Sequence, residues 1–147
     1  PSPVIARLAP PITLRLYSDN SSYAEDDRKL ITELASLCNK ISAEVVEAPN
    51  EDLKHTIAIL DADGHDLGMR FHGVPGGHEF NSFILALYNA AGPGQNIGEE
   101  AEKRIATISE PKNIHIAVSL TCTMCPDLVA AAVRIAASSP NVSTIWI

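Results

Sequence analysis

Apolar positions along the chain follow two periods, one typical of strands and one typical of helices. Alternating or continuous apolar runs predict strands at 12–17, 44–48, 56–60, 67–72, 114–119 and 142–147. Apolar residues spaced three and four apart predict helices at 23–40, 79–89, 98–109 and 126–138. The pattern therefore predicts an α/β fold. Ile41 completes the apolar stripe of the first predicted helix, and 56–60 is predicted to be a central strand.

Glycine and proline separate these elements. Residues 1–11 read as a proline-rich lead-in, and 92–96 read as a linker. The segment 61–65 lies between two predicted strands and predicts a hairpin turn. Asp61 and Asp63 in that turn could suggest calcium, but no ligand series or closing glutamate follows them. A turn is the preferred interpretation.

The chain carries an internal repeat. A shift of 102 residues lays the run 12–16 over the run 114–118, and both copies continue with a loop, a helix and a strand. Asn20 then takes the place of Cys122, and Tyr23 takes the place of Cys125. Two units of one fold are predicted, with thiols only in the second.

The first copy has the order strand, helix, strand, hairpin, helix. A right-handed crossover makes its first two strands parallel, and the hairpin adds antiparallel strands. This order resembles the thioredoxin and glutaredoxin folds. We therefore predict a redox-silent unit at 1–92, a linker and helix at 93–112, and the start of a redox-active unit at 113–147.

The second copy is incomplete, because nothing after Ile147 corresponds to 49–91. We expect 144–147 to form an exposed apolar edge, which invites pairing. Either the chain continues in a longer protein, which we favour, or another molecule completes the sheet, as a second copy would in a homodimer.

The candidate chemistry lies in Cys122-Thr123-Met124-Cys125, between a predicted strand and a predicted helix. Unpaired N–H groups and the positive dipole end of a helix stabilise a thiolate there. A thiolate attacks disulfides, and a second thiol one turn later displaces the mixed disulfide. We interpret Cys122 as the nucleophile and Cys125 as the resolving thiol.

Two other interpretations of the cysteine pair stay open. A structural zinc site would need two more ligands, and neither a second Cys-x-x-Cys nor a histidine pair follows. Two inert core thiols would more naturally lie inside the helix than at its start. The third cysteine, Cys38, lies on an apolar helical stripe and reads as a small core residue.

Composition limits the function further. The 147 residues are 46% apolar and carry a net charge of −7, with 11 basic and 18 acidic side chains. This charge argues against nucleic-acid binding and against an anionic membrane surface. Three cysteines are too few for a disulfide scaffold. No signal peptide or membrane-spanning run is visible, so we expect a cytoplasmic location.

Two motifs carry a resemblance to a known family. Residues 73–87, Gly-Val-Pro-Gly-Gly-His-Glu-Phe-Asn-Ser-Phe-Ile-Leu-Ala-Leu, resemble the G-x-P-x-G-H-E-F-x-S-x-x-L-A-L segment in the N-terminal domain of the F subunit of alkyl hydroperoxide reductase. Residues 119–127, Ser-Leu-Thr-Cys-Thr-Met-Cys-Pro-Asp, resemble its S-L-x-C-x-x-C-P-D site. The resemblance covers about 12–147 and implies tandem thioredoxin-like folds that share one mixed sheet, with the second incomplete at the C-terminus.

The resemblance also implies a function. The chain would relay electrons from a flavin reductase domain to a peroxiredoxin through Cys122 and Cys125. Glu79 matches a glutamate that the family places near the thiols, where it tunes the thiolate or moves a proton, and a helix N-terminal acid is the plain alternative. FAD and NAD(P)H are expected on a reductase domain outside this chain, and no cofactor is expected on the chain itself.

Two further features need a test. The Val74–Pro75 bond falls near where this fold places a cis-proline, but X-Pro bonds are mostly trans, so the sequence leaves the isomer of this bond open. His78 reads as a turn or cap residue.

A tandem-thioredoxin protein disulfide oxidoreductase is an alternative function, and so is a non-catalytic binding module with structural cysteines.

Overall fold

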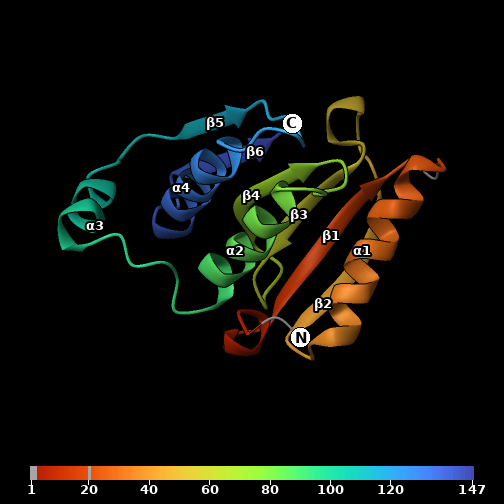
Figure 1. The fold of residues 1–147 in the computed structure, drawn as a ribbon, viewed down its shortest axis with the longest axis horizontal. Helices are drawn as coiled ribbons and strands as arrows, with labels where there is room; N and C mark the ends of the chain where they lie inside the picture. The colour runs from red at the N-terminus through yellow and green to blue at the C-terminus, as the bar shows by residue number, and fades with distance from the viewer. Residues whose placement is uncertain (1–2, 20) are drawn as a thin grey trace.

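The computed structural model describes residues 3–19 and 21–147, which form one six-stranded mixed sheet with helices on one face (Figure 1). The strands are β1 (Ile12–Ser18), β2 (Ile41–Glu47), β3 (Thr56–Leu60), β4 (Asp66–His72), β5 (Lys112–Ile116) and β6 (Val142–Trp146). The helices are α1 (Tyr23–Leu37), α2 (Glu79–Ala91), α3 (Glu99–Ala106) and α4 (Cys125–Ser138), with short 3-10 turns η1 (Ile5–Arg7) and η2 (Glu51–Leu53). Every predicted element is confirmed, although several ends shift by a few residues.

The sheet has the strand order β2-β1-β3-β4-β6-β5. Strand β1 is parallel to β2, and β3 is antiparallel to both β1 and β4, which confirms the predicted crossover and hairpin. Strand β6 is parallel to β4 and to β5. We call the elements from β1 to α2 the first unit, and β5, α4 and β6 the second unit. The β4–β6 pairing joins them into one sheet.

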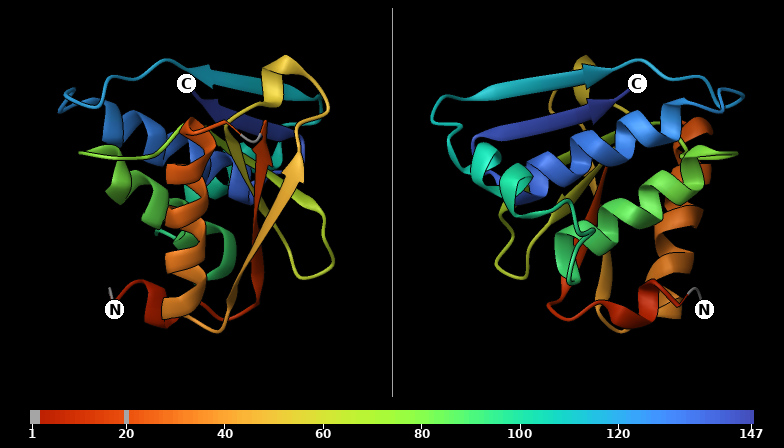
Figure 2. Two further views of the ribbon diagram at one scale, coloured as in Figure 1. Left: turned by 90° about the vertical axis from the view of Figure 1, so that its right-hand side faces the viewer. Right: turned by 60° about the vertical axis from the view of Figure 1, so that its left-hand side comes forward.

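Helices α1, α2 and α4 pack against the same face of this sheet, as both views in Figure 2 show. Alternate residues of β1 and β6 are buried beneath them. At the junction the ring of Phe71 in β4 lies 4.9 Å from that of Phe83 in α2 and 5.6 Å from that of Trp146 in β6, between centroids. The hydrophobic core is therefore continuous from one unit to the other.

Arg134 of α4 fastens the connection between the units. Its Nε donates to the Gln95 carbonyl oxygen at 2.7 Å, and its two terminal nitrogens contact Glu102 and Ser138. Gln95 also exchanges two hydrogen bonds with the Asn89 side chain, at 2.8 and 2.9 Å. These contacts attach the linker to α2 and α4, and they attach α3 to α4.

The assignment of Ile41 to the first helix was wrong. Helix α1 ends at Leu37, because Cys38 has extended backbone angles, and Ile41 begins β2 opposite Ile12. Cys38 is a free, partly buried cysteine at the end of α1, packed against the core. Its side chain is thus a core contact as predicted, although it lies outside the helix.

The prediction of an exposed edge at 144–147 was also wrong. Strand β6 lies between β4 and β5, and Trp146 is only 4% exposed. The apolar pattern offered no way to foresee that β6 would pair with the first unit. The outer strand at this end of the sheet is β5, whose second side has no partner strand within the described part of the chain.

Candidate redox site

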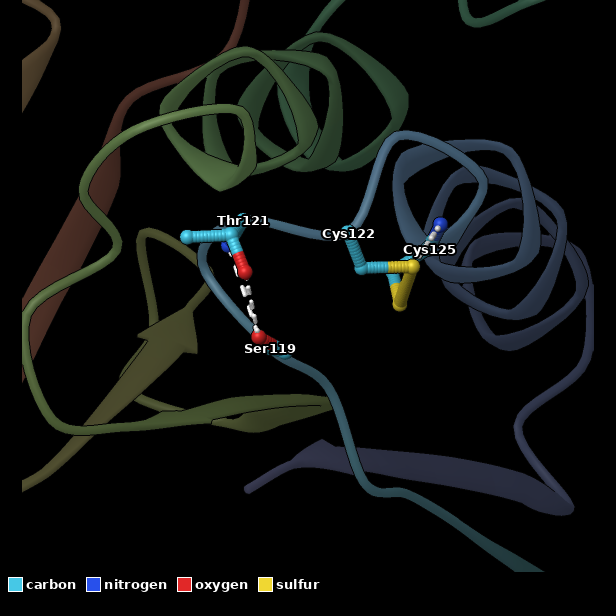
Figure 3. The surroundings of a disulfide bond; sticks show 4 residues. All are labelled: Ser119, Thr121, Cys122 and Cys125. Carbon is cyan, nitrogen blue, oxygen red and sulfur yellow. Dashed lines mark hydrogen bonds between the residues drawn. A yellow bond between two sulfur atoms is a disulfide. The ribbon is translucent and has the colours of Figure 1, made fainter.

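Cys122 and Cys125 form a disulfide at the start of α4 (Figure 3). Their Cα atoms are 5.6 Å apart, within the usual range for a disulfide. Cys122 lies in the loop after β5, and Cys125 is the first residue of α4, which confirms the predicted placement of both. Both residues are half-buried, so another molecule can approach them.

The start of α4 is arranged to stabilise negative charge on Cys122. The backbone N–H of Cys125 donates to the Cys122 sulfur at 3.1 Å. Pro126 occupies one of the first positions of α4, where the missing N–H would have no partner in the helix anyway. The positive end of the helix dipole therefore lies at the Cys122 sulfur and favours a thiolate there once the disulfide is reduced.

Backbone hydrogen bonds shape the loop that carries Cys122. The N–H of Val118 donates to the carbonyl of Ile147 at 2.9 Å, which extends the β5–β6 pairing beyond the strand ends. The N–H of Cys122 donates to the Ser119 carbonyl at 2.8 Å and closes a turn. The hydroxyl groups of Ser119 and Thr121 lie 3.0 Å apart in that turn (Figure 3). These hydrogen bonds tie Val118 to Ile147 and close the loop on itself between Ser119 and Cys122.

The first unit reaches this loop through the segment that precedes α2. Gly77 has a φ of +56°, and a Cβ there would lie 2.9 Å from the Leu120 carbonyl oxygen. Any larger residue would therefore separate the two segments. No peptide bond within the described residues is cis, so the Val74–Pro75 bond, whose isomer the sequence left open, is trans. The loop instead turns at its glycines and approaches the disulfide loop of the second unit.

Glu79 lies in the first turn of α2, two residues after Gly77. The residue is fully buried, and neither carboxylate oxygen has a hydrogen-bond partner within the described residues. A buried carboxylate without partners is costly to keep in a structural role alone. His78 precedes it at the N-cap position, exposed and without a side-chain capping bond.

The first unit has different side chains at the position that corresponds to the disulfide. Asn20, which the repeat aligns with Cys122, lies outside the described residues. Tyr23, aligned with Cys125, is 78% exposed, and its ring centroid lies 6.4 Å from that of His55. Nε2 of His55 lies 3.4 Å from Asp19 Oδ2. His55 also has a φ of +57°, unique among the described non-glycine residues.

Asp27, one turn into α1, was missed by the sequence reasoning. The residue is only 1% exposed, and its Oδ1 has no hydrogen-bond partner within the described residues. Burial raises the pKa of Asp27 to about 6, against the opposing influence of His55. The repeat aligns Asp27 with Val129, which is equally buried. An aspartate at a position where the repeat has a valine was the signal in the sequence that could have identified Asp27 as a buried carboxyl.

The hairpin turn at Asp61 is confirmed. Asp61 Oδ1 accepts hydrogen bonds at 2.9 Å from the backbone N–H groups of Asp63 and His65. These bonds, that of His65 first, lower the pKa of the Asp61 carboxyl. Asp61, Asp63 and His65 are close enough together to hold a metal ion, but hydrogen bonds within the turn already explain their arrangement.

No family model matches the chain. The F subunit of alkyl hydroperoxide reductase of Pseudomonas putida is 32% identical over 143 residues, which cover 97% of this chain and 27% of that protein. The crystal structure of an N-terminal domain of the Enterococcus faecalis F subunit is 36% identical, with a TM-score of 0.84. The match covers 97% of this chain and 73% of that one. The chain belongs to the family of alkyl hydroperoxide reductase F subunits.

Membership of this family confirms the resemblance predicted from the two motifs. A protein disulfide oxidoreductase from Aeropyrum pernix is 13% identical with a TM-score of 0.78, and this likeness concerns the fold alone. The chain spans about a quarter of the length of the curated relatives that it matches. Within the described residues, no helix is both long enough and apolar enough to cross a membrane.

Proposed function

We propose that this chain is a thiol–disulfide electron-transfer domain of an alkyl hydroperoxide reductase flavoprotein. The observation that carries the proposal is the Cys122–Cys125 disulfide at the N-terminus of α4, in a chain that belongs to the family of F subunits. Tyr23 at the aligned position in the first unit argues against a protein with two redox centres. The second unit alone would carry the chemistry.

The reaction begins with the reduced dithiol. The Cys122 thiolate attacks one sulfur of the partner's disulfide, so that a mixed disulfide forms, the partner's S–S bond breaks and its other sulfur leaves as a thiolate. The Cys125 thiolate then attacks the Cys122 sulfur, re-forms the intramolecular disulfide and releases the second partner thiolate. Two electrons pass to the partner, and the two protons lost by Cys122 and Cys125 balance those gained by the partner's thiols.

Glu79 would take part as a proton acceptor or donor for the thiols. Its carboxylate is fully buried without partners among the described residues, two residues from the Gly77–Leu120 contact between the units. A carboxylate in such surroundings can exchange a proton with a thiol while water is kept away. The silent first unit would thereby contribute to the chemistry of the second.

The partners follow from the family. A peroxiredoxin disulfide would accept the electrons, and a reductase domain with FAD and NAD(P)H would supply them. Neither cofactor is assigned to residues of this chain. The proposed relay needs only that Cys122 be reached by both partners in turn.

Transfer to a peroxiredoxin tests the proposal directly. The chain with Cys38→Ala would be reduced, freed of reductant and mixed with a disulfide-form peroxiredoxin, and thiols on each protein would be counted by mass spectrometry after alkylation. We expect two thiols to disappear from Cys122 and Cys125 and two to appear on the peroxiredoxin. Retention of both thiols on the chain, with a folded protein, would refute the relay.

A further inference from the structure

The chain has two methionines, and the structure places them in opposite surroundings. Met69 lies in β4, is 0% exposed and belongs to the hydrophobic core. Met124 lies between the two cysteines of the disulfide and is 73% exposed. The susceptibility of a sulfur atom to oxidation follows its exposure. The thioether of Met124 is therefore open to oxidants in solution, whereas that of Met69 is not.

Met124 is also the most exposed sulfur-bearing side chain when the disulfide is closed, because each of the three cysteines is less exposed than Met124. Cys122 and Cys125 are joined to each other, so neither is a thiolate that a hydroperoxide would attack. Cys38 is partly buried, with its Sγ 4.0 Å from the Ile5 carbonyl oxygen. A hydroperoxide that reaches the oxidised protein therefore meets the thioether of Met124 first.

The position of Met124 connects its oxidation state to the cysteine chemistry. Met124 is the N-cap residue of α4, and its side chain makes no capping hydrogen bond within the described residues. A thioether is a weak acceptor, so the N–H groups of the first turn stay available to Cys122, to which the Cys125 N–H donates at 3.1 Å. A strong acceptor on the N-cap side chain would compete for these N–H groups.

Oxidation of Met124 would create such an acceptor. The thioether sulfur attacks the terminal oxygen of a hydroperoxide, the O–O bond breaks, and this oxygen stays on the sulfur as a sulfoxide. The sulfur is oxidised by two electrons and the hydroperoxide is reduced to an alcohol, which keeps the proton of the hydroperoxide. An apolar side chain thereby becomes a polar one with an exposed oxygen, and methionine sulfoxide reductases can reverse the change.

We propose that Met124 is a reversible oxidation site for hydroperoxides, and that its sulfoxide slows disulfide exchange at Cys122. The inference rests on the proposed function, and the family of the chain is named for the reduction of alkyl hydroperoxides. The sulfoxide oxygen takes up N–H groups at the start of α4, so the Cys122 thiolate becomes less favourable. A tenfold smaller thiolate fraction, offset in part by a more nucleophilic thiolate, lowers the rate about threefold.

Peptide mapping by mass spectrometry tests whether Met124 is the modified residue. The chain with Cys38→Ala, in its disulfide form, would be treated with tert-butyl hydroperoxide and digested. We expect Met124 to gain one oxygen atom at least about ten times faster than Met69, and the difference to vanish in urea. Equal oxidation of both methionines in the folded chain would overturn the proposal, and so would an unmodified Met124 while a methionine-containing peptide in the same tube is oxidised.

Disulfide exchange measures the effect of the modification. After the peroxide is removed, dithiothreitol would open the disulfide, and reduction of hydroxyethyl disulfide by the isolated dithiol would be followed from about pH 6 to about pH 9. We expect the oxidised chain to react about three times more slowly at neutral pH, with the rise in rate moved to higher pH. Treatment with methionine sulfoxide reductases A and B, one for each sulfoxide epimer, should restore the rate.

Two substitutions at the same position supply the controls. Met124→Leu keeps the size and apolar character, and should retain the untreated rate before and after peroxide. Met124→Gln places a permanent amide oxygen there, and should be slow without peroxide. Circular dichroism would show that both variants are folded. If peroxide slows Met124→Leu as much as the unaltered chain, the damage lies elsewhere and the proposal is wrong.

The exchange measurement also separates this inference from the proposed function. A chain that is oxidised at Met124 but exchanges at its untreated rate would overturn the inference and leave the proposed function standing. An untreated chain that does not reduce hydroxyethyl disulfide would refute the proposed function, and the inference with it.

Discussion

The two units of this chain have the same strand–helix–strand plan but different residues where the helix begins. In the second unit a disulfide lies there, with an N–H of α4 directed at the Cys122 sulfur. In the first unit Tyr23 and His55 lie at the equivalent place, near the buried carboxyl of Asp27. The shared plan offers a helix N-terminus at the end of a strand in each unit, and the side chains placed there decide whether a disulfide can form.

The difference also extends into the core. Asp27 and Val129 occupy aligned positions one turn into their helices, and each is 1% exposed. Valine contributes apolar contacts in the second unit, whereas aspartate in the first unit adds the cost of a buried, incompletely paired carboxyl. The first unit has thus kept the fold with a less favourable residue at this position.

The largest expected effect comes from removing the two thiols one at a time. Cys122→Ser should reduce disulfide exchange to the uncatalysed background, because the attacking thiolate is lost. Cys125→Ser should instead accumulate a mixed disulfide with the partner, visible on a non-reducing gel. Cys38→Ala is the control and should retain exchange. Full activity of Cys122→Ser would show that the nucleophile is misassigned.

Val129→Asp would give the second unit the residue of the first. We expect the free energy of unfolding at neutral pH to fall by about 3–5 kcal/mol, because a buried charge would have no partner and the apolar contacts would be lost. Urea denaturation followed by circular dichroism measures this. Leu128→Asp, at the neighbouring exposed position, should change stability by less than about 1 kcal/mol. Equal losses in both variants would mean that burial at Val129 is not the cause.

Glu79→Gln tests whether the first unit takes part in the chemistry. We expect the rate of disulfide exchange at neutral pH to fall by about tenfold or more, with a changed pH profile, because an amide cannot accept a proton. Stopped-flow measurements from about pH 5 to about pH 9 would record this. Glu25→Gln, in the first turn of α1, is the matched control. An unaltered rate and profile in Glu79→Gln would leave Glu79 as a structural residue.

Asp27→Asn should produce the smallest effect, and one that depends on pH. The pKa of Asp27 is raised to about 6 in the folded protein. Proton binding by this carboxyl therefore adds to the free energy of unfolding in full below about pH 4, and this contribution is lost as the pH rises through 6. The variant should therefore be more stable than the unaltered chain by about 1–2 kcal/mol at about pH 7.5 and about equally stable at about pH 4, after allowance for solvent screening.

Chemical denaturation at the two pH values measures this difference. Asp26→Asn alters an exposed carboxyl in the same helix and should show no such dependence. A variant that gained equally at both pH values would contradict the assignment to proton binding by Asp27.

Much of the fold could be predicted because the strong apolar patterns act locally. The run at 56–60 matches β3, and the cysteine pair lies at the start of α4 as expected. The errors concern features that depend on contacts distant in sequence. Ile41 fits a helical stripe until Cys38 adopts an extended backbone, and only the pairing of β6 with β4 shows that β6 is internal.

The candidate site was predictable in part for the same reason. Cys122 and Cys125 are identified by local spacing and context, whereas Glu79 depended on a resemblance. Asp27 and His55 lie 28 residues apart in the numbering and come close only when β1, α1 and β3 assemble. Gly77 lets the two units meet, but nothing in the sequence around it indicates that Leu120 is its neighbour.

We propose that the second unit holds a working dithiol and that the first unit does not. A titration of the chain with Cys38→Ala in defined thiol–disulfide buffers tests it most directly, with alkylation and mass spectrometry to assign the cysteines. We predict one reversible two-electron transition at Cys122 and Cys125, with a midpoint between about −180 and −300 mV. Thiols that stay unreactive until the protein is denatured, with no reversible transition, would contradict the claim and indicate a structural cysteine pair.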